Sequence, residues 1–171
     1  MPDLSTRTDD VHMIREVHLN YGRDKEVQAP LTDSGVVAEF LRGVVMDTSR
    51  EHAVAIYLDA KNRPLGWRIV SVGTDVMAPV KPLLVLQPAV LLGANAMIFA
   101  HNHPSGDPCP STHDIALTRR LVAVGEILGV PVLDHLVIGR GTYSSLRDMG
   151  LIGAAEENIT CDGLAAKGSA D

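Results

Sequence analysis

The sequence predicts a single α/β domain in which helices flank a mixed β-sheet. The 171 residues suit one compact domain with a sizeable core. Short runs rich in β-favouring residues are followed by segments whose apolar residues recur at helical spacing. Some of these runs are joined by tight turns, as in hairpins, and others are separated by a helix. Because strands and helices are mixed in this way, we expect one α/β domain with a mixed sheet.

The first half of the chain is expected to supply one helix and one hairpin. Thr32-Asp33-Ser34 offers a helix cap, and apolar residues at helical spacing extend the helix over 34–47. A strand is expected over 51–59, followed by the turn Lys61–Gly66 and a returning strand over 67–72. Before them, 1–30 is expected to be an N-terminal extension, with a weakly alternating strand at 11–19.

The second half is expected to supply two helices and three strands. The segment 81–95 is apolar on nearly every side and predicts a buried helix that Pro88 kinks or interrupts. A short buried strand at 96–100 delivers His101. A loop with three prolines then leads to a helix that opens at Ser111 and stops at Gly129. The remaining expectations are strands at 132–138 and 142–146, a domain boundary near 154, and a loose tail over 155–171.

Composition narrows the class of function. A formal charge of −6 argues against a broad surface for duplex nucleic acid, which needs a surplus of Lys and Arg. The two cysteines, Cys109 and Cys161, give no sign of a disulfide scaffold and fit a reducing compartment. No signal-peptide pattern is visible, and the longest apolar stretch is too interrupted to span a membrane. We therefore expect a cytoplasmic protein.

Two imidazoles and a carboxylate lie within fourteen residues, from His101 and His103 to Asp114. Residues two apart on an extended segment point to one side, so both histidines can face one ion. Asp114 falls in the first turn of the next helix and can face back toward the strand end. Two His and one Asp form a three-ligand set of the kind used by catalytic zinc, with the fourth position left for water.

Other interpretations of these residues, without a metal, compete with the metal site. Ser111 and Asp114 have the spacing of a capping box, which alone explains both residues. His101-Asn102-His103 alone is compatible with an exposed turn, and Cys109 in the same loop is interpreted as inert. The nuclease family named for His-Asn-His has those residues dispersed, so it is not favoured here. The combination of apolar strand, His-x-His-Pro, rigid loop, Ser and Asp favours a metal site.

A metal-dependent hydrolase also needs a carboxylate near the metal that does not bind it. Glu51 is the best candidate because it stands where a strand begins. A solvated glutamate at a strand edge is an equally weighted alternative. A nucleotide cofactor is not indicated, since no phosphate-cradling Gly-rich loop follows a strand.

The pattern Glu51 … His101-x-His103-Pro104 … Ser111-x-x-Asp114 resembles the signature of the JAMM (JAB/MPN+) metalloproteases. Further stretches resemble the RadC-like branch of that family, over roughly residues 30–150. They are Glu51-His52, Leu58-Asp59, Val72-Gly73-Thr74, His101–Pro108, Thr118–Leu121 and Leu133-Asp134-His135. The resemblance implies a JAB/MPN-like (cytidine-deaminase-like) domain over 31–154.

The resemblance also implies a role for each residue of the signature. His101, His103 and Asp114 would bind Zn²⁺, Glu51 would be the general base and then the proton donor, and Ser111 would hydrogen-bond the oxyanion. The segment 75–79 departs from the usual pattern of the family. The helix–hairpin–helix module of full-length RadC proteins is not expected in the few residues that precede the first helix.

These implications favour a zinc peptidase or isopeptidase that processes a ubiquitin-like protein or its conjugates, as prokaryotic relatives do in conjugation or defence systems. The first alternative is a RadC-like DNA-associated factor tied to repair or mobile elements, which the acidic charge and the missing module weaken. The second is a non-catalytic scaffold, which the intact set of five signature residues opposes. The oligomeric state is not indicated.

Overall fold

The computed structural model describes residues 29–44, 48–73, 80–153 and 167–168. The strand expected at 11–19 lies outside these residues, as does most of the tail expected over 155–171. Within that tail only Lys167–Gly168 are described, where they pair with a neighbouring strand. The α/β fold class and the mixed sheet are confirmed.

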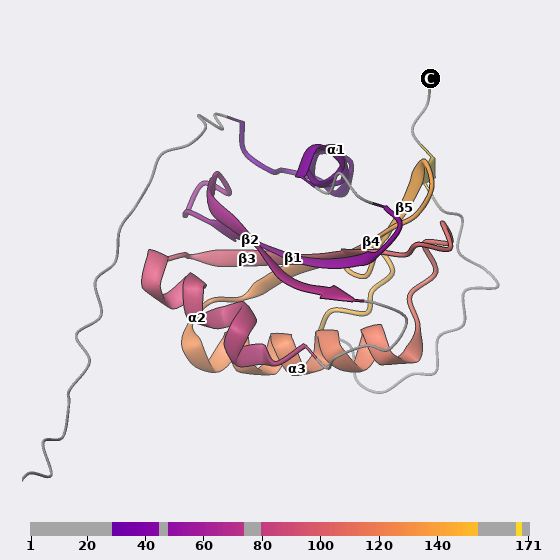
Figure 1. Cartoon of the computed structure of the whole chain (residues 1–171). Helices are drawn as coiled ribbons and strands as arrows, with labels where there is room; N and C mark the ends of the chain where they lie inside the picture. The colour runs from indigo at the N-terminus through magenta and orange to yellow at the C-terminus, as the bar shows by residue number, and fades with distance from the viewer. Residues whose placement is uncertain (1–28, 45–47, 74–79, 154–166, 169–171) are drawn as a thin grey trace, which may run out of the picture.

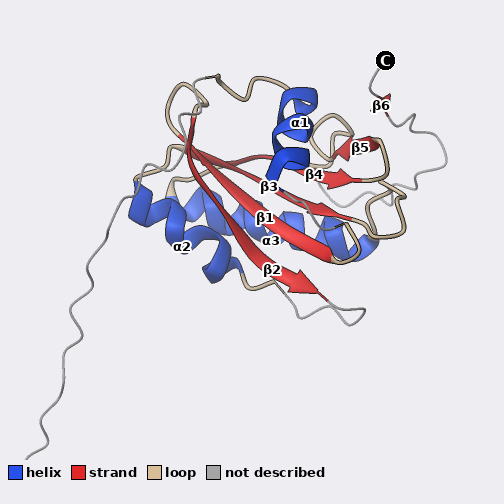
Figure 2. Cartoon of the chain, turned by 45° about the horizontal axis from the view of Figure 1, so that its top comes forward, coloured by secondary structure: helices blue, strands red, loops and turns tan. Residues whose placement is uncertain are grey.

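A six-stranded sheet in the order β2-β1-β3-β4-β5-β6 forms the centre of the molecule, and it is antiparallel except between β3 and β4 (Figure 2). Helix α1 covers one face, and α2 and α3 cover the other (Figure 1). The strands are β1 (Glu51–Leu58), β2 (Pro64–Gly73), β3 (Ala96–Asn102), β4 (Val132–Ile138), β5 (Thr142–Ser145) and β6 (Lys167–Gly168). The helices are α1 (Ser34–Val44), α2 (Pro82–Leu92) and α3 (Thr112–Leu128).

Two cores separate the layers because the central strands bury both of their faces. All of β3 and seven of the eight residues of β1 are buried. Alternate residues point to opposite sides. Tyr57 and Phe99 therefore pack against α2 and α3, whereas Ile56 and Ile98 pack against α1. This alternation assigns every residue near the ends of β1 and β3 to a face.

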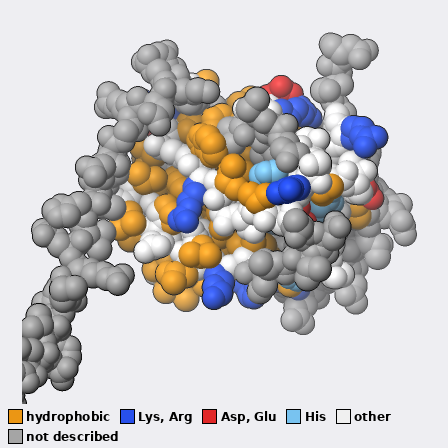
Figure 3. Space-filling view, viewed as in Figure 1, with side chains coloured by type: hydrophobic (Ala, Val, Ile, Leu, Met, Phe, Trp, Pro, Cys, Tyr) orange, Lys and Arg blue, Asp and Glu red, His pale blue; other side chains and the backbone are white. Residues whose placement is uncertain are grey.

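The helix predicted within 81–95 is present as α2, but the expectation that it is buried was wrong. Helix α2 buries only Val85, Leu86 and Ala89, and it continues through Pro88. Four of its large apolar side chains are exposed, namely Leu83 at 69 %, Leu84, Val90 and Leu91. Trp67 on β2, which a core would normally accommodate, is also 47 % exposed. Apolar surface accordingly gathers over β2 and α2 in the space-filling view (Figure 3). A helix that is apolar all round has no polar stripe to mark the face that stays in solvent.

Gly125 permits the close approach of α3 to the chain that enters β4. A Cβ atom at this position would lie 2.5 Å from the carbonyl oxygen of Val130. We expect Gly125→Ala to lower the free energy of unfolding by about 1–3 kcal/mol through overpacking. Gly43→Ala is the matched control, because nothing lies within 4 Å of its Cβ position in α1. That change should stabilise by up to about 1 kcal/mol. Urea denaturation measures both, and equal effects would contradict the prediction.

Candidate metal centre

The parallel pair β3–β4 and the helix between them bring the predicted ligands to one end of the sheet. His101 lies on β3, and His103 follows it after Asn102 ends the strand. The loop that continues from His103 is tied to the β4–β5 hairpin. The N–H of His103 donates to the carbonyl of Ile138 at 2.9 Å, and the N–H of Arg140 donates to Gly106 at 2.9 Å. These bonds hold the loop in place before α3 begins.

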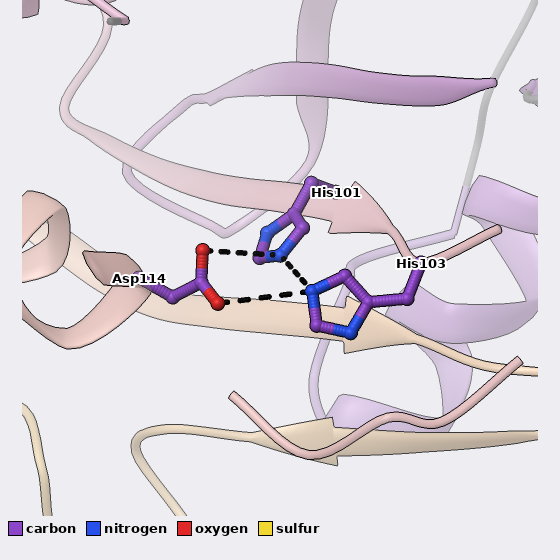
Figure 4. Close-up of side chains that lie close together, drawn as sticks. All are labelled: His101, His103 and Asp114. Carbon is purple, nitrogen blue, oxygen red and sulfur yellow. Dashed lines mark hydrogen bonds and ion pairs between the residues drawn. The ribbon is translucent and has the colours of Figure 1, made fainter. Parts of the chain in front are cut away.

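His101, His103 and Asp114 converge as the sequence predicts (Figure 4). The Nε2 atoms of the two histidines are 3.0 Å apart. The carboxylate of Asp114 lies 3.3 Å from Nε2 of His101 and 3.7 Å from Nε2 of His103. His101 and Asp114 are buried, at 3 % and 4 % exposed. His103 is partly exposed, so the site opens to solvent on its side.

This spacing fits a metal ion. Nitrogen and oxygen ligands about 2.0–2.2 Å from a tetrahedral ion lie roughly 3.3 Å from one another. The backbone also orients His103, since its Nδ1 lies 2.8 Å from the carbonyl oxygen of Asp107. A carbonyl only accepts, so Nδ1 carries a proton, and in the neutral imidazole Nε2 presents its lone pair toward His101. The three side chains therefore form a group that can hold a metal ion.

Neighbouring groups at the site shift the pKa values of Asp114 and His103. Burial alone would raise the pKa of Asp114, but the imidazoles of His101 and His103 and the Ser111 hydroxyl outweigh burial and hold that pKa well below its usual range. The neighbouring Asp114 carboxylate raises the pKa of His103 against the effect of burial, and the negative charge of Glu51 adds to the rise. Asp114 is thus an anionic group beside two imidazoles.

Ser111 caps α3 in the capping box expected as the alternative to a functional role. Its hydroxyl oxygen accepts from the N–H of Asp114 at 3.2 Å, and the Asp114 carboxylate accepts from the N–H of Ser111 at 2.7 Å. The hydroxyl also donates to Oδ2 of Asp114 at 2.6 Å. The cap and the metal ligand are therefore the same carboxylate, so the two interpretations of Asp114 are compatible. The Ser111 proton points at Asp114 in this arrangement.

Glu51 is brought to the same end and face of the sheet. Ala53 pairs with His101 across β1 and β3, and residues two apart share a face. Glu51 therefore faces the side that carries His101, and its carboxylate interacts electrostatically with His103. It is not one of the three converging ligand atoms. Glu51 thus lies on the same side of the sheet as the converging group, outside the set of three.

Two polar residues of the site were missed by sequence reasoning. Asn102 spans β1 and β3, because its side chain accepts from the N–H of His52 at 2.8 Å and donates to the carbonyl of Arg50 at 2.9 Å. These bonds hold the backbone on both sides of Glu51. His135 on β4 is fully buried and lies 2.8 Å from His101, and its burial lowers its pKa well below the usual value. Both lie in stretches that resemble the RadC-like branch, but no role follows from the local pattern, because their contacts join distant segments.

A cavity of about 510 Å³ adjoins the two histidines, on the side of the sheet that α1 covers. Its apolar walls include Leu41, Val54 and Ile138, and Arg42 and Arg140 also line it. Nη2 of Arg42 is buried without a hydrogen-bond partner. No acidic side chain lines the cavity among the described residues. The cavity is therefore largely apolar and carries two guanidinium groups, of which that of Arg42 is paired with Glu39.

Cys109, interpreted from the sequence as an inert loop residue, is disulfide-bonded, which the low cysteine count did not indicate. Two cysteines far apart in the sequence give no signal of pairing, because pairing depends on the folded distance. Of the helices in the described part of the chain, none has the length and apolar character needed to cross a membrane.

Comparison with known proteins agrees with this geometry. Residues 31–151 match the family model of the RadC-like JAB domain. A UPF0758 protein from Desulforamulus reducens is 44% identical over 126 residues, covering 74% of this chain and 54% of that protein. One from Symbiobacterium thermophilum is 45% identical over 122 residues, covering 71% and 52%. This chain thus spans about half the length of the curated relatives it matches. By the extent of the family match and by the residues that converge at its site, the chain belongs to the RadC-like JAB domain family.

Proposed function

We propose that this chain is a zinc-dependent metallopeptidase of the JAMM type that cleaves a peptide or isopeptide bond of a ubiquitin-like protein. The convergence of His101, His103 and Asp114 supports the proposal, and so does the electrostatic interaction of Glu51, outside that group, with His103. A structural cap alone would need Ser111 and Asp114 but neither the two facing imidazoles nor the adjacent carboxylate.

Two imidazole nitrogens and one carboxylate oxygen suit zinc and leave one coordination position free. When bound, zinc supplies Lewis acidity that acidifies water and polarises a carbonyl. The carboxylate of Glu51 takes a proton from the attacking water and later delivers it to the leaving amine. Asn102 keeps Glu51 in place through its bonds to Arg50 and His52.

The hydroxyl of Ser111 is the proposed donor to the oxyanion. In the structure its proton goes to Asp114, so it must turn away from that carboxylate as negative charge develops on the substrate. A donor aimed at an oxyanion contributes roughly 2.7–4 kcal/mol to transition-state stabilisation in other hydrolases. Ser111 would then serve both the helix cap and the reaction.

Substitution of Ser111 separates these two roles. Ser111→Ala should lower the free energy of unfolding by about 1 kcal/mol because the cap is lost. It should also lower kcat by about 10²-fold because the donor is lost. Ser111→Gly retains most of the cap preference and should therefore reduce kcat as much while costing only a few tenths of a kcal/mol. If both variants retain wild-type kcat, Ser111 is a cap alone.

The cavity on the α1 side is the proposed binding site for an extended substrate segment, which would pass the end of β3 to reach the converging side chains on the opposite side. Its apolar walls suit aliphatic side chains, and Arg42 and Arg140 suit an acidic group. An extended tail of a ubiquitin-like protein provides such a segment. Its backbone can also pair with an exposed strand edge.

Incubation of the full chain with fusions of ubiquitin-like proteins tests the proposed function. We expect cleavage by the zinc-loaded protein, loss of cleavage with a chelator, and recovery when zinc is added back. Failure of the zinc-loaded protein to cut any of a panel of such fusions would count against the proposal. Cleavage unaffected by the chelator would exclude its metal-dependent form.

A further inference from the structure

We propose that Thr118 and His135 are positioning residues that fix His101 in the tautomer able to bind a metal through Nε2. The inference rests on the proposed metal centre. It also assigns a role to two stretches, Thr118–Leu121 and Leu133–His135, that the signature of ligands and base does not explain. Thr118 lies on α3 and His135 on β4, so neither is adjacent to His101 in the sequence.

The donor and acceptor of each hydrogen bond can be assigned beginning with Thr118. Its hydroxyl lies 2.7 Å from the backbone carbonyl of Asp114, and a carbonyl can only accept. The single hydroxyl proton is therefore used in that bond. Oγ1 of Thr118 is also 2.5 Å from Nδ1 of His135. Because the hydroxyl has no second proton to give, Nδ1 of His135 must be the donor in this contact.

The same reasoning assigns the donor and acceptor in the hydrogen bond between His135 and His101. The side chain of His135 is fully buried, and its ring nitrogens contact Thr118 and His101 rather than a carboxylate. A buried imidazole without a counter-ion is neutral and has one N–H group. With the proton on Nδ1, Nε2 of His135 accepts from Nδ1 of His101 at 2.8 Å. Nε2 of His101 is therefore left without a proton.

This arrangement directs two lone pairs at one point. In its neutral form, which is the form that binds a metal, His103 also has an unprotonated Nε2, because its Nδ1 donates to Asp107. The two Nε2 atoms are 3.0 Å apart with the Asp114 carboxylate beside them. The chain of hydrogen bonds begins at the backbone of Asp114 and ends at His101, which faces the carboxylate of the same residue. This chain of hydrogen bonds thus connects two proposed ligands on different elements and fixes their relative positions. Outer partners of this kind tune metal affinity.

Thr118→Val tests the proposal, since it removes the hydroxyl and keeps the shape of the side chain. Without Thr118 Oγ1, Nδ1 of His135 has no acceptor, so His135 can place its proton on Nε2 and force the opposite tautomer on His101. We expect zinc affinity, measured by competition with a chelator, to fall by about 10–100-fold. Thr118→Ser keeps the hydroxyl and should bind zinc within about threefold of wild type. Thr142→Val is the matched control, because the buried Thr142 hydroxyl has no hydrogen-bond partner.

Nitrogen NMR of the zinc-free chain, labelled at histidine, provides a readout that a purely structural role would not move. The wild type should show His101 protonated at Nδ1, and Thr118→Val should show a shift of that proton toward Nε2. Protonation of His101 at Nε2 in the wild type would overturn the inference, as would wild-type zinc affinity in a folded Thr118→Val variant. If the wild type binds no zinc, the proposed function fails, but the tautomer of the zinc-free protein still decides this inference. If Thr118→Val does not fold, the wild-type spectrum decides it.

Discussion

Glu51→Gln should fold and bind zinc like the wild type and lose about 10²–10⁴-fold in kcat, the usual contribution of a general acid–base residue. Gln preserves the size and polarity of the side chain but cannot take a proton from water at neutral pH. The backbone around residue 51 should not move, because Asn102 holds Arg50 and His52 through backbone groups that the substitution leaves intact. Glu51 also lies outside the set of converging ligands.

Steady-state cleavage of a fusion substrate and zinc titration of both proteins measure this effect. Glu126→Gln, which removes the same charge from an exposed position late on α3, is the control and should keep wild-type kcat. A Glu51→Gln variant with kcat within a few-fold of wild type would show that the carboxylate is a solvated strand-edge residue. Loss of zinc together with activity would make Glu51 a ligand, not a base.

The ligand set could be predicted because its signals are local. His101 and His103 follow an apolar run that had to be a buried strand, and Asp114 stands at the third position after a capping serine. Each signal depends only on residues within a few positions of one another. The structure places all three side chains at one end of the sheet because β3, the following loop and α3 are consecutive in the chain.

The supporting residues could not be predicted because their contacts are long-range. Asn102 joins β1 to β3, and His135 joins β4 to β3. Both depend on the order of strands, which strand-forming patterns do not specify. The exposure of α2 and Trp67 has the same origin, since apolar content alone does not show how much of an element a neighbour covers. Sequence patterns thus identified which side chains converge at the site, but not which residues hold them in place.

Asp114→Asn should have the largest effect on the metal centre. Asn retains an oxygen that can accept the N–H of Ser111, so the cap of α3 should survive. The anionic ligand is lost, and we expect zinc affinity to fall by at least about 100-fold, beyond the effect of changing an outer partner. By linkage, the stabilisation that zinc gives the folded protein should fall by about 2.7 kcal/mol at saturating zinc.

Thermal unfolding with and without zinc measures this loss directly. The difference in stability between the zinc-bound and the zinc-free protein is taken for each variant, so any change that the substitution makes to the zinc-free fold cancels. Asp107→Asn is the matched control. It removes one negative charge from the same loop, and its side-chain oxygen can still accept from the N–H of Cys109. Its backbone carbonyl, which orients His103, is unchanged. Long-range attraction of the loop for cations would make the two variants lose zinc equally. Direct coordination by Asp114 predicts that Asp107→Asn keeps nearly the full zinc-dependent stabilisation while Asp114→Asn loses it.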